Sequence, residues 1–311
     1  MERKKLLLLN PNEYEHNLDR QALNALEGTP GLEKAMRKIN KHGVERAFRL
    51  GYTGSNIKVT PENFPDIYEL LEEACANIYL KDLPDLYIAW DYTVNAFAVG
   101  SEKPMIILNS GAIDLLSREE LLYVIGHEAG HIKSGHMLYH QMALILPFLG
   151  DIIGSATLGV GSLVSTGLEL ALLYWYRMSE LTADRAGLLA CQDKEAVFGA
   201  LMKMSGVPKN FYDKMKTEDF VKQAKDFKGF DYDALDKVAK VVLISIQDHP
   251  WTVMRTSELI KWVDSGTYSE IIERHGKENL EDLEITCSKC GHKLKGNETF
   301  CGVCGQKVWK R

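Results

Sequence analysis

The sequence predicts an α+β fold that is mostly helical, with a small antiparallel sheet and a small cysteine-rich module at the C-terminal end. Three observations predict it: apolar residues at helical spacing over residues 67–79, three β-rich runs between Leu86 and Asn109, and four cysteines within the last 25 residues. The 311 residues are 45% hydrophobic and 26% charged, a globular composition that excludes disordered, collagen-like and coiled-coil proteins. We therefore expect a large domain over residues 1–275, a charged linker over 276–285 and a small module over 286–311.

The net charge bears on whether the protein binds nucleic acid, and the N-terminal residues bear on where in the cell it is located. The net charge is -6, so the whole chain offers no electrostatic attraction to nucleic acid. The apolar run near the N-terminus, Leu6 to Leu9, has four leucines, whereas the apolar core of a signal peptide needs about 7–15 residues. The sequence therefore predicts a protein that is in the cytoplasm or faces it, with membrane association as an open alternative.

The predicted elements follow one another without a long linker. After the helix over 67–79, turn residues separate β-rich runs over 86–90, 94–99 and 104–109, which predict the antiparallel sheet. Ser117 and Glu120 then have the spacing of a capping box and open a helix that runs to about His136. Further helices are expected over 195–204 and 232–246.

The helix that Ser117 opens contains His127, Glu128 and His131 in an HExxH pattern. Residues four apart lie on one face of a helix, so the two imidazoles can bind one Zn²⁺, and Glu128 between them can act as general base. A catalytic zinc needs a third protein ligand, for which Glu180 is the candidate. Asp184, one turn further on, can accept a hydrogen bond from a ligand histidine and so fix its orientation.

This interpretation has two alternatives. The two histidines could simply lie on a solvated helix surface, but their neighbours have the composition of a core: Ile125, Gly126, Ala129 and Gly130. His136 or His140 could be the third ligand, but His136 lies about 140° around the helix from His131. Gly135 directly before it leaves little room for a turn, so we expect both histidines to face solvent or an interface.

From Leu86 to Arg255 the chain resembles the HtpX-type and CAAX prenyl protease-type (Oma-like) zinc metallopeptidases, which are gluzincins. The resemblance rests on ordered motifs: Asn95, Ala96, Phe97 and Ala98; HExxH at 127–131; Glu180 and Asp184; and His249-Pro250 followed by Arg255.

The resemblance implies a zincin-like core in which His127, His131 and Glu180 bind zinc and Glu128 is the base. It also implies that the Asn-Ala-Phe-Ala strand is a sheet edge that pairs with an extended polypeptide substrate. His249 is expected to donate a hydrogen bond to the oxyanion, and Arg255 to lie near the zinc-ligand helix.

Residues 137–176 form an apolar insertion between the two metal-site helices. Its uncharged stretches, 137–150 and 152–168, are 14 and 17 residues long, below the roughly 20 that a spanning helix needs. HtpX-type proteins have membrane-spanning helices in this interval. Three interpretations stay open: a buried helical hairpin, a hairpin that touches or re-enters a membrane, and a surface for self-association. Asp151 and Glu169 would be costly in lipid, which favours the first slightly.

The four C-terminal cysteines form two Cys-x-x-Cys pairs, Cys287 with Cys290 and Cys301 with Cys304, each followed by glycine. This spacing predicts a structural zinc ribbon over 286–311 rather than two disulfides. Several lysines make the ribbon locally basic. A protein partner is the main expectation, because aromatic residues that would stack on nucleic acid are few.

These patterns together predict a zinc metalloendopeptidase with one catalytic and one structural Zn²⁺. A role in protein quality control follows from the resemblance alone. The alternative is a catalytically latent, zinc-bearing scaffold that recruits partners through the ribbon and the apolar insertion.

Overall fold

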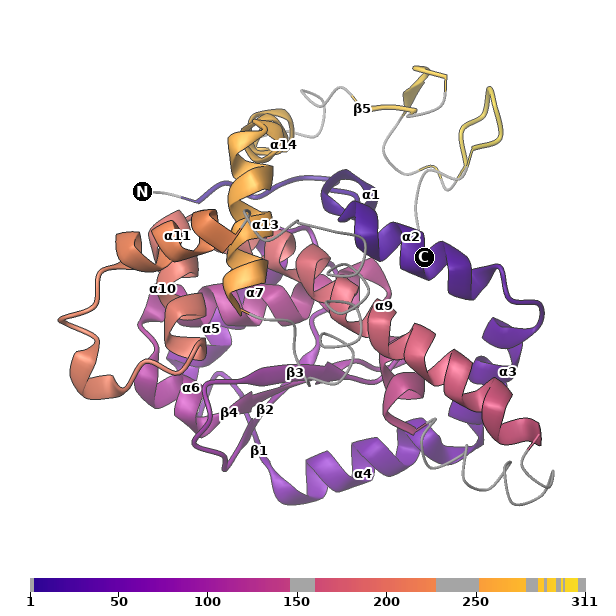
Figure 1. The fold of residues 1–311 in the computed structure, drawn as a ribbon, viewed down its shortest axis with the longest axis horizontal. Helices are drawn as coiled ribbons and strands as arrows, with labels where there is room; N and C mark the ends of the chain where they lie inside the picture. The colour runs from indigo at the N-terminus through magenta and orange to yellow at the C-terminus, as the bar shows by residue number, and fades with distance from the viewer. Residues whose placement is uncertain are drawn as a thin grey trace.

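The computed structural model describes residues 3–145, 160–227 and 252–277, together with 285–287, 290–294, 298 and 300–306 (Figure 1). In the first half of the chain the elements are α1 (Pro11–Tyr14), α2 (Asn17–Glu27), α3 (Leu32–Ile39), η1 (Asn40–Val44), α4 (Glu45–Ser55), β1 (Ile57–Lys58), α5 (Pro65–Asn77), β2 (Asp85–Ala89), β3 (Ala96–Val99), β4 (Met105–Asn109), α6 (Ser110–Leu115) and α7 (Arg118–Ser134). Then follow α9 (Val160–Cys191), α10 (Lys194–Met204), η2 (Lys209–Phe211), α11 (Thr217–Asp226), α13 (Thr252–Asp264), α14 (Thr267–His275), β5 (Ile285–Thr286) and β6 (Lys293–Leu294).

The main sheet has four strands in the order β1-β2-β4-β3, and it is mixed. Strand β2 runs parallel to β4, whereas β1 and β3 pair antiparallel with their neighbours. The expectation of an antiparallel sheet was therefore wrong. The chain does reverse at both predicted turns, but β3 lies at the edge and β4 returns between β3 and β2. Two reversals make β4 parallel to β2, and only the spatial order of the strands makes them neighbours.

The sheet is covered on both faces because alternate side chains point to opposite sides. Tyr87, Met105 and Ile107 face Phe48 and Tyr52 of α4. The alternate residues of β2 and β4 point to the other face, where they belong to the main hydrophobic core together with residues of α5 and α7. They are Leu86, Ile106 and Leu108. Figure 1 shows α4 on one side of the sheet and α7 on the other. All five residues of β4 are buried, as expected for a central strand that is covered on both faces.

Helix α7 begins and ends as its sequence dictates. Ser117 Oγ accepts a hydrogen bond from the Glu120 amide (3.3 Å), and the Glu120 carboxylate accepts one from the Ser117 amide (2.7 Å), which confirms the capping box. Gly135, at φ 75°, ends the helix in the left-handed conformation, which glycine adopts at little cost. The chain after Gly135 therefore leaves the helix axis and turns back.

Two glycines let α7 approach α9 closely. A Cβ added to Gly126 would lie 2.4 Å from Cβ of Ala190, and one added to Gly130 would lie 2.4 Å from Cβ of Ala186. Real carbon contacts need about 3.5–4.0 Å. Because the four positions repeat one turn apart on each helix, the two backbones pack closely along the segment that carries the metal-site motifs.

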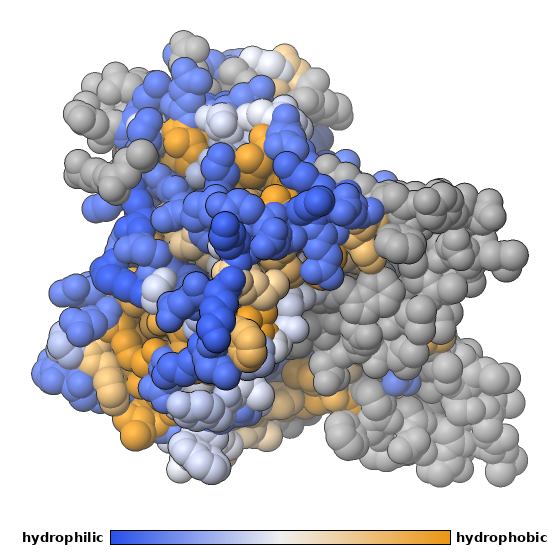
Figure 2. Space-filling view, turned by 60° about the vertical axis from the view of Figure 1, so that its left-hand side comes forward, coloured by the Kyte–Doolittle hydropathy of each residue, from blue (hydrophilic) through white to orange (hydrophobic). Residues whose placement is uncertain are grey.

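The N-terminal helix α2 packs against α9 through Leu23 and Leu26, which contact Leu172 and Trp175. These last two residues belong to the predicted apolar insertion, whose described ends are thus partly buried in protein. Residues 146–159 of the insertion, and the helix expected over 232–246, lie outside the described residues. In the part of the chain that the structure describes, no helix has both the length and the apolarity needed to cross a membrane. The face shown in Figure 2 is mainly hydrophilic, with apolar patches between the polar side chains.

Candidate metal centre and active site

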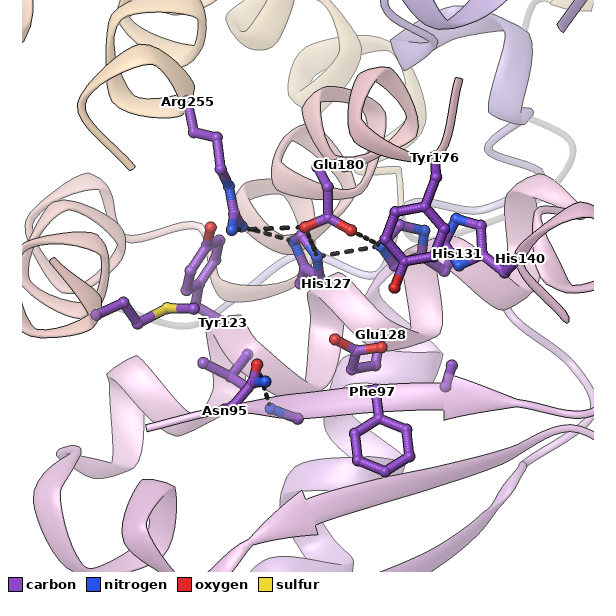
Figure 3. A pocket seen from close by; sticks show the side chains of 14 residues that line it. Asn95, Phe97, Tyr123, His127, Glu128, His131, His140, Tyr176, Glu180 and Arg255 are labelled. Atoms are coloured by element: carbon purple, nitrogen blue, oxygen red, sulfur yellow. Dashed lines mark hydrogen bonds and ion pairs between the residues drawn. The ribbon is translucent and has the colours of Figure 1, made fainter. Parts of the chain in front are cut away.

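Helix α7 places His127 and His131 one turn apart on the side that faces α9. Their Nε2 atoms are 3.2 Å apart, and the two residues are 6% and 2% exposed. Glu180 of α9 faces them, with one carboxylate oxygen 3.4 Å from His127 Nε2 and the other 3.2 Å from His131 Nε2. The three ligand groups predicted from the sequence therefore meet at one point (Figure 3).

The spacing of these atoms fits a tetrahedral metal ion. Two ligand atoms that each lie about 2.0–2.1 Å from zinc are about 3.3 Å apart when the angle between them is tetrahedral. The observed separations of His127, His131 and Glu180 are 3.2–3.4 Å. Two imidazoles and one carboxylate form a donor set typical of catalytic zinc. The residues present therefore fit the zinc ion that the motif predicts.

Asp184 contacts His127 at Nδ1, the ring nitrogen that points away from the candidate metal site. Its Oδ1 lies 3.0 Å from His127 Nδ1 and also accepts a hydrogen bond from the Tyr123 hydroxyl (2.7 Å). Arg255 donates to both Asp184 oxygens, at 2.5 and 2.8 Å. Sequence analysis placed Asp184 and Arg255 near the ligand helix, but it missed Tyr123. The available signal was that Tyr123 precedes His127 by four residues and so shares its helix face.

The charges around Asp184 set the proton affinity of the centre. Burial raises the pKa of Asp184, but the charge and hydrogen bonds of Arg255 outweigh it and hold the pKa well below its usual range. Burial likewise lowers the pKa of His127, but hydrogen bonds to Asp184 and Glu180 raise it to about 9. Burial dominates at His131 and lowers its pKa to about 4. A zinc ion needs unprotonated imidazole, so binding would displace a proton from His127.

Glu128 lies between the metal-site cluster and strand β3. It is 6% exposed and lines the same cavity as the three candidate ligands. In Figure 3 its carboxylate lies below His127 and His131, with Phe97 of β3 beyond it. A general base must reach a water held at the ligand cluster, and Glu128 lies on the correct side of the cluster for this.

Strand β3 forms one wall of the cavity, through Asn95, Ala96, Phe97 and Ala98. Among the described strands it pairs only with β4, so its other side is a sheet edge. The Asn109 amide donates to the Asn95 carbonyl, and this hydrogen-bonded pair sets the alternation of the antiparallel ladder. The backbone groups of Ala96 and Ala98 consequently point away from β4. The Asn95 side chain accepts from the Ala96 amide (3.0 Å).

The structure corrects the expectation that His136 and His140 face solvent or an interface. Both are buried, at 1% and 6% exposure. The left-handed residue Gly135 turns the chain back toward the helix, so the positions of His136 and His140 do not follow the helical wheel. Nδ1 of His136 lies 2.9 Å from Nδ1 of His131, and His140 Nε2 lies 2.8 Å from Ser179 Oγ. His249, the expected oxyanion donor, lies outside the described residues.

The C-terminal cysteines also come together. Their sulfur atoms all lie within 4.8 Å of one another, with the Cys287–Cys304 and Cys290–Cys301 pairs at 3.6 Å. Four thiolates around one zinc at about 2.3 Å are about 3.8 Å apart, whereas a disulfide needs about 2.05 Å. None of the six cysteines is in a disulfide. The observed distances therefore fit a metal ion.

Comparison with known proteins identifies the family. The sequence pattern named Peptidase family M48 matches residues 61–263 of this chain. The chain belongs to peptidase family M48. The chain is 30% identical over 274 residues to the plastoglobule-localized metallopeptidase 48, chloroplastic, of Arabidopsis thaliana, covering 87% of this chain and 78% of that protein. It is 27% identical over 179 residues to a Protease HtpX homolog of Streptococcus uberis and 30% identical over 172 residues to one of Bifidobacterium longum.

The two HtpX homologs are matched over part of their length. Each alignment covers 48% of this chain, and the chain spans 60% of the Streptococcus uberis protein and 56% of the Bifidobacterium longum protein. No solved structure matches the chain. Membership of this family confirms the resemblance to HtpX-type zinc metallopeptidases that the motifs indicated. This protein is therefore a zinc metallopeptidase. The family pattern begins after α4, so it leaves the N-terminal helices α1 to α4 outside the matched segment.

Proposed function

We propose that this M48 protein is a zinc-dependent endopeptidase that binds its substrate as an extended strand along β3 and cleaves it with Glu128 as general base. One observation carries the proposal. The three candidate ligands lie 3.2–3.4 Å apart in a cavity that Glu128 and the edge strand β3 also line. Every group that peptide hydrolysis requires at this centre, apart from an oxyanion donor, comes from the described residues.

The residues around the centre have separate roles in metal binding, proton transfer and ligand orientation. When bound by His127, His131 and Glu180, Zn²⁺ would supply a Lewis acid that polarises the scissile carbonyl and lowers the pKa of a water molecule. Glu128 takes a proton from the attacking water and gives it to the leaving amine. Asp184 keeps the proton of His127 on Nδ1, so that Nε2 faces the metal site. His249 remains the predicted oxyanion donor.

An edge strand explains both how the substrate binds and why internal bonds are cut. The outward carbonyl of Ala96 and the outward backbone groups of Ala98 can pair with the backbone of an extended peptide, while the Ala96 amide donates to the Asn95 side chain. Backbone pairing needs neither end of the substrate and reads few side chains. The proposed activity is therefore cleavage within unfolded or extended segments, which suits the quality control of damaged proteins.

The cysteine cluster is proposed to be a structural zinc ribbon over 286–311, joined by a linker over 276–285 to the peptidase domain over 1–275. Four thiolates at metal-ligand spacing support it, and the ribbon would hold a protein partner rather than nucleic acid. We place the protein in the cytoplasm, with residues 137–176 as the segment that would touch a membrane or a second copy of the chain.

The test compares casein digestion by the zinc-loaded wild type and by Glu128→Gln. We expect the variant to lose about 10²–10⁴-fold in rate while it keeps its zinc, because only the proton transfer is removed. Glu273→Gln makes the same chemical change at an exposed position of α14 and is the matched control. Full hydrolysis by Glu128→Gln would contradict the mechanism. No hydrolysis by the wild type would favour the latent scaffold.

A further inference from the structure

A buried chain of hydrogen-bonding groups runs from the zinc-ligand helix to the N-terminal helix α2. Nδ1 of His131 lies 2.9 Å from Nδ1 of His136, and Nε2 of His136 lies 3.3 Å from a carboxylate oxygen of Asp19. Asp19 is fully buried, and His136 is 1% exposed. Neither side chain lines the cavity that holds Glu128, so neither can touch a substrate there.

The chain of groups fixes which nitrogen of His131 is free for a metal. If His131 binds zinc through Nε2, its Nδ1 must carry the proton, and among the described residues the atom placed to accept that proton is Nδ1 of His136, 2.9 Å away. His136 then carries its own proton on Nε2 and donates it to Asp19. This is the single tautomer assignment in which every link has one donor and one acceptor.

Asp19 is built to accept that bond. One of its oxygens accepts from Trp175 Nε1 (2.9 Å), and the other accepts from the Thr182 hydroxyl (2.5 Å). Trp175 and Thr182 belong to α9, which also carries Glu180, so Asp19 is positioned against the same helix as the third ligand.

We propose that Asp19 and His136 are positioning residues of the zinc site, which orient His131 as Asp184 orients His127. The proposal makes α2 part of the metal centre, although α2 lies outside the segment that the family pattern matches. It rests on the proposed function, since it takes His131 as a zinc ligand.

A competing interpretation is that His131, His136 and His140 bind a second metal ion, since their nitrogens cluster within 4.8 Å. The distances decide against it. The two Nδ1 atoms of His131 and His136 are 2.9 Å apart, which is a hydrogen-bond length, whereas two ligands of one zinc are about 3.3 Å apart. The Nε2 atom of His140 is already bonded to Ser179.

The experiment measures zinc affinity of the full chain by competition with a chelator. We expect Asp19→Asn and His136→Phe each to weaken binding about 10- to 100-fold, the usual effect of losing a partner of a ligand histidine. His136→Asn keeps an acceptor oxygen near the position of Nδ1 and should restore part of the loss. Substitution of cobalt for zinc separates the two sites, because thiolate-bound cobalt gives intense charge-transfer absorption and a His/Glu site does not.

The matched control is His275→Phe. His275 is also a buried histidine (1% exposed) paired with a carboxylate, Glu13, at 2.8 Å, but that pair does not contact a metal ligand. We expect it to lower the melting temperature without changing zinc affinity. Thermal unfolding of the metal-free variants shows whether each one folds, and Asp19→Asn serves if His136→Phe does not.

Two outcomes overturn the inference. One is unchanged zinc affinity in folded His136→Phe and Asp19→Asn. The other is a loss from Asp19→Asn that is as large in the His136→Phe background as in the wild type, because Asp19 would then not act through His136. A wild type whose His/Glu site takes up no cobalt or zinc would instead overturn the proposed function, so the two failures are distinguishable.

Discussion

The close approach of α7 and α9 gives a quantitative prediction for Gly130→Ala. The new Cβ would lie 2.4 Å from Cβ of Ala186, and carbon atoms need about 3.5–4.0 Å, so the helices must separate locally by more than about 1 Å. Glu180 Oε1 is now 3.2 Å from His131 Nε2, close to the roughly 3.3 Å that a shared zinc requires. The same separation would move these two ligands apart from the spacing that one zinc ion favours and so weaken its binding.

We therefore expect Gly130→Ala to lose about 1–3 kcal/mol of stability through overpacking. Zinc affinity should fall by about tenfold or more, since 1.4 kcal/mol is a factor of ten in a binding constant. Thermal unfolding of the metal-free chain measures the first effect, and chelator competition measures the second. Peptidase activity should fall with zinc occupancy and recover in part at saturating zinc.

Two further variants make the test specific. Gly167→Ala is the same change on α9, where no described atom outside the neighbouring helix backbone lies within 4 Å of the added Cβ, so it should be neutral or stabilising by about 0.5–1 kcal/mol. Adding Ala186→Gly to Gly130→Ala removes the clashing atom and should restore zinc affinity. Gly130→Ala with wild-type stability and zinc affinity would refute the reasoning.

Three more outcomes are expected. Ala98→Pro removes an outward amide from β3 and should raise KM several-fold with little change in melting temperature. Phe97→Pro removes an inward amide and should destabilise the fold. Equal KM values for Ala98→Pro and the wild type would exclude substrate pairing at this edge. Burial raises the pKa of Glu258, but bonds to His16 and Lys261 outweigh it and lower the pKa to about 2. Because the pKa of Glu258 is depressed in the folded state, the contribution of this carboxylate to stability is complete above about pH 4.5 and is lost toward pH 2. The melting temperature of Glu258→Gln should therefore change less with pH between about 4.5 and 2 than that of the wild type. The same pH dependence in both proteins would contradict the assignment. Cys301→Ser should lower the zinc content by one per chain and leave casein hydrolysis intact, and unchanged zinc content would argue against the ribbon.

The local elements of the site were predictable because each depends on neighbours in the sequence. The capping box at Ser117 and Glu120 starts α7 as expected, and the four-residue spacing of His127 and His131 puts both on one face. Glu180 was the candidate third ligand because Asp184 lies one turn beyond it on a later helix, and the resemblance to a family supported the choice. Its carboxylate lies 3.2–3.4 Å from the Nε2 atoms of His127 and His131, and its role as a zinc ligand stays a prediction.

Where the prediction failed, a tertiary contact or a change of chain direction was decisive. The strand limits were close, but the position of β4 between β2 and β3 could not be obtained from turn residues. His136 was assigned by its angle on a continuing helix, although Gly135 ends that helix and brings His136 back to His131. Gly135 was noted in the sequence, but its left-handed conformation was not used.

The sequence by itself determined the chemistry available to this protein: an HExxH helix, a glutamate and an aspartate one turn apart, and two pairs of cysteines. These follow from residue type and spacing, which short-range geometry converts directly into shared helix faces and tight turns. Only the tertiary structure decided which histidine each of these groups contacts, namely Asp184 with Arg255 at His127 and Asp19 with His136 at His131. Such contacts join residues far apart in the chain. They form because the packing of α2, α7, α9 and α13 removes these polar groups from water, and buried polar groups are stable only when they are hydrogen-bonded to one another.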